Sequence, residues 1–131
     1  MITDPISDML TRIRNANMRS YREVSFPFSK FKFLICEKLK ENDFLLESWV
    51  TKDKREIKVK IKHFNKISSI DALKKISKPS QRIYFTKEEI KKNCLGKRIY
   101  LVSTSKGLMT HKEALVKKIG GEIIFFISRN W

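Results

Sequence analysis

Few side chains in this sequence are placed to catalyse a reaction or to hold a metal ion. His63 and His111 are far apart, and neither stands at a metal-ligand spacing from Cys36 or Cys94. A serine nucleophile needs an oriented base, and the only histidine near Ser103 is His111, without a nucleophile-elbow glycine pattern. No phosphate-binding or dinucleotide-binding glycine motif occurs. We therefore predict no catalytic residue, metal or cofactor, and keep a hydrolase using Ser103 and His111 as a distant alternative.

Three successive hydroxyl side chains, Ser103, Thr104 and Ser105, are the best candidates for recognising a ligand. Each hydroxyl can donate and accept, which suits base edges and 2′-hydroxyls in a shallow RNA groove. Gly107 closes this predicted loop, and it either lets the backbone approach a ligand or supplies a positive φ angle. Turns built of serine and threonine are also common without any function. The residues alone leave both interpretations open.

A second candidate segment, residues 74–84, interleaves cations, hydroxyls and one aromatic ring. Its cations suit phosphates, and Tyr84 could stack on a base or a ribose. A solvated basic hairpin with a half-buried tyrosine explains the same pattern. The alternating Lys58, Lys60 and Lys62 are less specific, because an exposed sheet face carries charge for solubility in any case.

The net charge favours a polyanionic partner. The 131 residues contain 29 Lys+Arg and 14 Asp+Glu, for a formal net charge of +15, and such an excess on a folded domain usually indicates nucleic acid. Residues 66–131 hold 15 basic and 5 acidic side chains, against 14 and 9 in residues 1–65, so the second half should face more phosphate. No apolar run approaches the ~18 residues of a membrane span, and Met1 leads directly into a capped helix pattern, so we expect neither a membrane partner nor a signal peptide.

The first half predicts helices and an antiparallel sheet. A helix begins at Asp4-Pro5, and its apolar side chains recur at helical spacing. An edge strand is expected from Val24 to Phe28, because it contains Pro27. Ser29 caps a second helix that ends at Asn42-Asp43, with this predicted buried face: Phe31, Leu34, Ile35 and Leu39.

Two further strands complete the predicted first half, and they flank a hairpin turn at Lys52–Lys54. Residues 44–51 form one of them, and residues 55–64 form the other. Ile57, Val59 and Ile61 alternate with the three lysines, which predicts one buried and one cationic face.

The second half predicts more strands and shorter helices. Residues 67–78 and 82–85 read as strands, and Thr86 with Glu89 forms a capping box. A strand over 98–102 leads into the hydroxyl loop. Thr110 and Glu113 form a second capping box, which begins a helix. This helix starts with an exposed His111 and stops at Gly120-Gly121. The apolar run 123–127 predicts a central strand.

The predicted fold class is α+β, with an αβαββ lobe over residues 1–65 and a β-rich lobe over residues 66–131 that carries the hydroxyl loop. The two cysteines are too few for a disulfide framework, which indicates a reducing compartment.

The chain resembles the bacterial-type small-subunit ribosomal protein eight family over almost its whole length. Five segments in order carry the resemblance: residues 3–16 (TDPISDMLTRIRNA), 74–79 (KKISKP), 82–84 (RIY), 103–110 (STSKGLMT) with Glu113-Ala114, and 120–123 (GGEI).

The resemblance implies a primary binder of the central domain of the small-subunit (16S-type) rRNA. In this family the two lobes of the protein bind an irregular RNA hairpin, largely through its minor groove. It also implies contacts with small-subunit proteins five and twelve, and in some bacteria with the protein's own messenger RNA. Carried over position by position, it assigns RNA contact to these residues: Ser103, Thr104, Ser105, Gly107, Glu122, Tyr84, Lys78, Arg82, Thr3, Arg14, Asn15 and Lys30.

Some positions depart from the family pattern. Ser80-Gln81 replaces a usual glycine and apolar residue, Asn42-Asp43 replaces a glycine-bearing helix end, Lys97-Arg98 stands where a second glycine is common, and Ser128–Trp131 extends past the last strand. None of them alters the hydroxyl loop. A generic nucleoid-type DNA-binding protein is the main alternative function. The richness in lysine, isoleucine and phenylalanine indicates an AT-rich genome, which fits a bacterium, a mitochondrion or a plastid.

Overall fold

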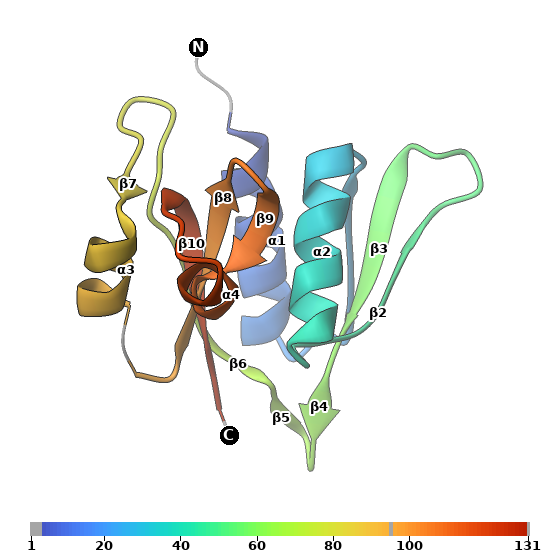
Figure 1. The fold of residues 1–131 in the computed structure, drawn as a ribbon. Helices are drawn as coiled ribbons and strands as arrows, with labels where there is room; N and C mark the ends of the chain where they lie inside the picture. The colour runs from blue at the N-terminus through green and yellow to red at the C-terminus, as the bar shows by residue number, and fades with distance from the viewer. Residues whose placement is uncertain (1–3, 95, 131) are drawn as a thin grey trace. The chain divides into compact units, whose positions relative to one another are not determined.

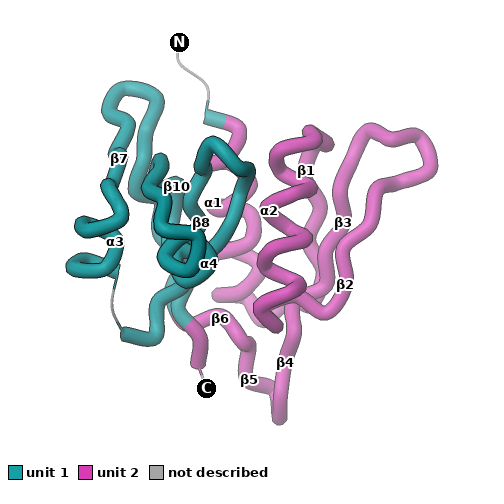
Figure 2. Tube along the Cα trace, in the orientation of Figure 1, with its two compact units in different colours: residues 1–4, 72–128 teal, residues 5–71, 129–131 magenta. Residues whose placement is uncertain are grey.

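A computed structural model of the chain describes residues 4–94 and 96–130 and is mixed α+β (Figure 1). It divides into two compact units, coloured separately in Figure 2. Unit 2 comprises residues 5–71 with Arg129 and Asn130, and unit 1 comprises Asp4 with residues 72–128. The predicted fold class is therefore confirmed. The division into lobes 1–65 and 66–131 stays a prediction.

Unit 2 is built from two helices, a three-stranded sheet and a small hairpin. Its elements are α1 (Pro5–Met18), β1 (Glu23–Pro27), α2 (Lys30–Glu41), β2 (Leu45–Val50), β3 (Glu56–Ile61), β4 (His63–Phe64) and β5 (Ile67–Ser68). The sheet is antiparallel in the order β1-β3-β2, so β1 is the edge strand that Pro27 predicts. Ile57, Val59 and Ile61 are buried, as the alternation predicts. Helix α1 contacts β1, and helix α2 contacts β2.

The buried face of α2 differs from the predicted one. Leu34 is 45% exposed, whereas Lys32 is only 4% exposed. The Lys32 ammonium donates a hydrogen bond to the Pro27 carbonyl at 3.2 Å, so its aliphatic stem lies in the core while its polar end is satisfied. The helix therefore buries positions 32, 35, 36 and 39, a complete i, i+3, i+4, i+7 stripe.

Unit 1 is a sheet with two short helices. Its elements are β6 (Ile70–Lys75, which begins in unit 2), β7 (Tyr84–Phe85), α3 (Lys87–Asn93), β8 (Arg98–Thr104), β9 (Gly107–Thr110), α4 (His111–Val116) and β10 (Gly121–Arg129, whose last residue lies in unit 2). The strand order is β6-β10-β8-β9, with β7 also paired to β10. The apolar run 123–127 thus forms a central strand, as predicted.

Both predicted capping boxes are present at the starts of α3 and α4. Several predicted boundaries are wrong. The segment 67–78 contains the separate strands β5 and β6, the segment 55–64 divides into β3 and β4, and α4 ends at Val116, before Gly120. The early end of α4 has a local cause: Lys118 and Ile119 donate hydrogen bonds to the carbonyls of Leu115 and Ala114, which closes a Schellman motif.

Candidate nucleic-acid interface

Four residues that are distant in sequence form one cross-strand row in unit 1. Glu122 on β10 pairs with Tyr84 on β7 and with Ser103 on β8, and Ser103 pairs in turn with Leu108 on β9. Residues directly opposite each other in an antiparallel sheet place their side chains on the same face. We call Tyr84, Glu122, Ser103 and Leu108 the Tyr84–Leu108 row.

The next row of the same sheet faces the core. Ile123, Val102 and Met109 are paired with one another, are nearly or fully buried, and pack in one cluster with Ile90 of α3 and Ala114 of α4. Since successive strand residues alternate between faces, the Tyr84–Leu108 row points away from α3 and α4.

Two consecutive glycines allow the strands of this row to approach one another. A Cβ atom at Gly121 would overlap the Ser103 carbonyl oxygen, and one at Gly120 would overlap the Phe85 carbonyl oxygen. Any other residue at either position would push β10 away from β8 or β7. Gly120 and Gly121 therefore position the row by allowing β10 to lie close to β7 and β8.

The hydroxyl segment is a tight hairpin, which corrects the predicted loop over residues 103–107. Ser103 and Thr104 end β8, Gly107 begins β9, and only Ser105 and Lys106 form the turn. Gly107 has a φ angle of +110°, which favours glycine. The Thr104 hydroxyl donates to the Gly107 carbonyl at 2.8 Å and accepts from the Lys106 N–H at 3.1 Å.

The two serines beside Thr104, Ser103 at the end of β8 and Ser105 in the turn, differ from it. Neither the Ser103 nor the Ser105 hydroxyl has a hydrogen-bond partner in the described part of the chain, Ser103 is half-buried and Ser105 is exposed. Both hydroxyls are therefore open to a ligand, whereas the Thr104 hydroxyl holds the shape of the turn.

A basic hairpin lies beside β10. The main chains of Lys78 and Gln81 exchange two hydrogen bonds of 2.9 and 3.0 Å, so Pro79 and Ser80 form its turn. Ser77, which is 1% exposed, accepts a hydrogen bond from the Ile83 N–H at 3.0 Å. Sequence reasoning missed the role of Ser77, because a lone serine in a polar segment gives no signal of burial.

An ion pair joins Arg82 to Glu122 of the row. Arg82 Nη1 lies 3.1 Å from Glu122 Oε2, and the arginine side chain is 52% exposed against 16% for the glutamate. Tyr84 is 65% exposed, so its ring is available for stacking. Lys78 is also exposed. The structure thus brings Tyr84, Arg82, Glu122 and Ser103 together in unit 1.

The remaining predicted contacts belong to unit 2 or lie outside the described residues. Arg14 and Asn15 are exposed on α1, and Lys30 is exposed as the first residue of α2. Asn15 lines a shallow groove of about 380 Å³ with Arg12 and Arg19, among other residues. Thr3 lies outside the described part of the chain.

His111 is buried, which corrects the prediction of an exposed residue. It is 4% exposed, and its Nδ1 accepts a hydrogen bond from the Tyr100 N–H at 3.1 Å. Burial, helped by the nearby Lys112 charge, lowers the pKa of His111 below its ordinary value. No hydrogen bond joins His111 to Ser103 among the described residues, so the pair required by the hydrolase alternative is not assembled.

The remaining groups of chemical interest are also inert or dispersed. Burial raises the pKa of the Cys36 thiol to about 12 and that of Cys94 to about 11, so both remain protonated thiols at neutral pH. The described residues contain no group of three or more histidine, cysteine, aspartate or glutamate side chains that could hold a metal ion. Within the same residues, no helix is long and apolar enough to cross a membrane.

Comparison with known proteins gives the family. The family model described as "Ribosomal protein S8" matches residues 4–128. The chain belongs to the ribosomal protein S8 family.

Curated relatives agree with this assignment to the S8 family. Small ribosomal subunit protein uS8 of Phytoplasma australiense is 43% identical over 128 residues, which are 97% of this chain and 98% of the relative. The protein of the same name from Mesomycoplasma hyopneumoniae (strain 7448) is 46% identical over 127 residues, 96% of this chain and 97% of the relative. That of Mycoplasma capricolum subsp. capricolum is 47% identical over 128 residues, 97% and 99% of the two chains. The resemblance stated from the sequence motifs is confirmed.

Proposed function

We propose that this chain is a structural protein of the small ribosomal subunit that binds the central domain of the 16S-type rRNA during assembly and catalyses no reaction. Membership of the S8 family and relatives named as small-subunit proteins support the ribosomal role. The observation that carries the RNA site is the Tyr84–Leu108 row. On one face of a sheet it combines the exposed Tyr84 with the Ser103 hydroxyl, which has no hydrogen-bond partner among the described residues.

The chemistry of the row suits an irregular RNA, with accessible bases and riboses, better than a uniform RNA duplex. Tyr84 offers a flat surface for a base or a ribose, and Ser103 and Ser105 offer hydroxyls that both donate and accept. Arg82 is held by Glu122 at 3.1 Å, so its guanidinium is oriented before any RNA arrives. Unit 2 would add RNA contacts through Arg14, Asn15 and Lys30. In unit 1, Lys78 would bind the RNA backbone beside the row.

Charge supplies most of the affinity in this proposal. With a formal net charge of +15, binding should release counterions, so that contact with ~6 phosphates gives a logarithmic salt slope of about −4 to −6. Filter binding to a central-domain rRNA fragment and to a plain RNA duplex over a salt series measures the slope. Equal affinity for both RNAs at every salt concentration would remove the site-specific part of the proposal.

Removal of one hydroxyl group tests the role of the hydroxyl turn, by which we mean residues 103–106. Ser105→Ala removes one open hydroxyl at an exposed position, and it should weaken binding of the cognate fragment by about 1–3 kcal/mol, because an RNA partner is left without its hydrogen bond. Binding of the plain duplex should not change. Thr11→Ala is the matched control, since it removes an exposed hydroxyl from α1.

The same assay separates the alternatives. A generic nucleoid-type protein would bind DNA and RNA equally and would not respond to Ser105→Ala. A loss of affinity that Thr11→Ala reproduces would also count against the hydroxyl turn.

The finer partners belong to the same proposal. Contacts with small-subunit proteins five and twelve, and with the protein's own messenger RNA, follow from the family resemblance and can be tested by crosslinking within purified subunits. The relatives reported above come from bacteria, which favours a bacterial ribosome over a mitochondrial or plastid one.

A further inference from the structure

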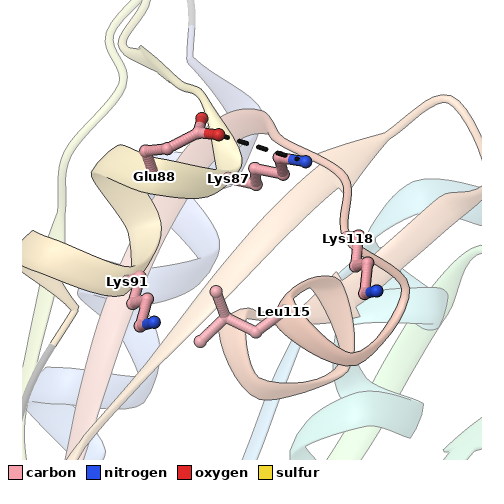
Figure 3. Close-up of a pocket in the computed structure, with 5 residues that line it drawn as sticks. All are labelled: Lys87, Glu88, Lys91, Leu115 and Lys118. Atoms are coloured by element: carbon pink, nitrogen blue, oxygen red, sulfur yellow. Dashed lines mark ion pairs between the residues drawn. The ribbon is translucent and has the colours of Figure 1, made fainter.

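The helix side of unit 1 carries a cationic pocket that the proposed function does not use. The helices α3 and α4 contact each other, and the pocket between them is lined by Lys87, Glu88, Lys91, Leu115 and Lys118 (Figure 3). Its volume is about 270 Å³. Because both helices cover the face of the sheet opposite to the Tyr84–Leu108 row, this α3–α4 pocket and the row are separate surfaces.

The charge of the α3–α4 pocket is only partly neutralised. Glu88 is the only acidic side chain among the described residues that line it. The Glu88 carboxylate lies 4.0 Å from the Lys87 ammonium, and the two side chains are 73% and 52% exposed, so their interaction is weak. Lys91 and Lys118 have no ion pair among the described residues. Three lysines, one half-buried leucine and one glutamate are therefore the described residues that line the pocket.

Lys118 occupies a position where a lysine costs stability. It is the C′ residue of the Schellman motif that ends α4, and its φ angle is +56°. Glycine is usual at this position, because a Cβ atom is strained in the left-handed region. Figure 3 shows the Lys118 side chain beside the pocket, across Leu115 from Lys91. The fold thus keeps a positive charge at the pocket where an uncharged glycine would be more stable.

We propose that the α3–α4 pocket binds the phosphodiester backbone of a second RNA segment, so that unit 1 holds two segments on opposite faces of its sheet. Lysines bind phosphates as point charges, and Leu115 offers an apolar surface for a ribose. An acidic peptide fits less well, because among the described residues that line the pocket none belongs to a strand and only Leu115 is apolar. The inference rests on the proposed function, which supplies the first RNA segment.

Two leucines report on the two sites separately. Leu108 belongs to the Tyr84–Leu108 row, and Leu115 lines the pocket. The full chain, with 13C-labelled leucine methyl groups, is first saturated with an RNA hairpin from the 16S-type central domain, which should shift Leu108. A generic RNA duplex is then added, and it should shift Leu115 without displacing the hairpin.

Each outcome of this titration decides something. A shift of Leu108 with an unmoved Leu115 would overturn the second site and leave the proposed function intact. Unmoved signals at both leucines would overturn both. If oligo-glutamate shifts Leu115 and the duplex does not, the pocket takes an acidic protein segment, and the inference is wrong.

Two glycine variants separate a role in binding from a role in structure. Lys118→Gly and Lys66→Gly each remove one charge at a positive φ angle, +56° and +68°, and Lys66 is exposed at the β4–β5 turn of unit 2. Both variants should keep or raise the thermal midpoint of unfolding. Only Lys118→Gly should weaken binding of the added duplex to the saturated complex and reduce its logarithmic salt slope by about 1. An equal reduction in both variants would contradict the pocket, because total charge alone would then explain the binding.

Discussion

Thr104 stabilises the hydroxyl turn, whereas the neighbouring Ser103 and Ser105 do not. The Thr104 hydroxyl makes two hydrogen bonds within the turn, at 2.8 and 3.1 Å, and it therefore fixes the path of the chain. Ser103 and Ser105 keep their hydroxyls open among the described residues. A substitution at Thr104 should therefore alter the geometry of the turn, whereas one at Ser105 should remove a ligand contact and leave the fold unchanged.

His111 shows how a buried polar group can be satisfied and still sensitive to pH. Its Nδ1 is the acceptor for the Tyr100 N–H, and its ring meets the Tyr100 ring edge-on at 5.5 Å between centroids. Protonation of that nitrogen would remove the acceptor and place a charge in an apolar cluster. The low pKa of His111 in the fold expresses this cost.

The first prediction is a dependence of stability on pH that passes through His111. Because its folded pKa lies below the value near 6.5 of the unfolded chain, the unfolded state binds more protons between these two values. The contribution of His111 to the free energy of unfolding is therefore complete above pH ~7.5 and is lost as the pH falls through ~6.5 towards the folded pKa. Urea unfolding across this range measures the loss.

The control for this prediction is His111→Asn. The amide oxygen of asparagine can accept the Tyr100 N–H but does not titrate. The variant should lose less stability than the parent between pH ~7.5 and ~5.5, although carboxylates titrate in both. Parallel pH profiles for the two proteins would show that His111 is not the responsible group.

At the scale of elements, the site depends on how closely three strands approach one another. Gly120 and Gly121 are needed because carbonyl oxygens of Phe85 and Ser103 occupy the space of their missing Cβ atoms. The β7–β10 and β10–β8 pairings meet at Glu122. This geometry holds Tyr84 and Ser103 on either side of one carboxylate.

The second prediction concerns Gly121→Ala. The new methyl group overlaps main-chain atoms that cannot rotate away, so β10 must shift from β8 at a cost of about 1–3 kcal/mol in the free energy of unfolding. The Tyr84–Leu108 row is distorted, and affinity for the cognate RNA should fall by more than that of the plain duplex. Urea unfolding and filter binding measure the two effects.

Gly96→Ala is the matched control for this variant. Gly96 has a φ angle of +83° and open space around its Cβ position, so alanine there strains the backbone without displacing a strand. The control should be destabilised but should still prefer the cognate RNA. A preference that survives in Gly121→Ala as well would mean that strand spacing does not matter for recognition.

The sequence predicted elements better than the contacts between them. Capping boxes, the edge position of Pro27 and the alternation in β3 follow from local chemistry, and all are present. The Tyr84–Glu122–Ser103 arrangement is not local, because it depends on which strands pair. Counting apolar residues also missed the buried Lys32 and the exposed Leu34, since a lysine stem can fill a core position when its ammonium finds a carbonyl.

The sequence indicated the three hydroxyls as candidates, but it did not indicate which of them is used within the turn and which is open to a ligand. Residue type marked Ser103, Thr104 and Ser105 as a group, whereas only the hairpin geometry distinguishes Thr104 from the serines. The α3–α4 pocket gave no sequence signal either. Lys118 joins Lys87 and Lys91 only because the Schellman motif ends α4 at that point.

At the scale of the whole molecule, the described residues that follow the family match, Arg129 and Asn130, belong to unit 2. Because β10 runs to Arg129, the prediction that Ser128–Trp131 extends past the last strand is wrong for Ser128 and Arg129. The match to the S8 family ends at residue 128, and Arg129 and Asn130 pack with unit 2. The Arg129 guanidinium donates to the Asn42 carbonyl at 2.7 Å and lies 4.7 Å from the centre of the Phe44 ring. Asn130 donates to the Ser68 carbonyl at 2.7 Å. Trp131, the last residue of the chain, lies outside the described residues.

The third prediction is that this extension stabilises unit 2. Arg129→Ala removes a charged hydrogen bond and a cation–π contact, which should lower the free energy of unfolding by about 1–3 kcal/mol. Arg98→Ala is the control, because Arg98 lies 4.3 Å over the Phe126 ring of unit 1 and resembles Arg129 in its aromatic contact. Amide hydrogen exchange should accelerate at Phe44 and Ser69 in the first variant and at Val102 in the second. Equal acceleration in both units for Arg129→Ala would mean that the units unfold together, and the extension then stabilises the whole chain rather than unit 2 alone.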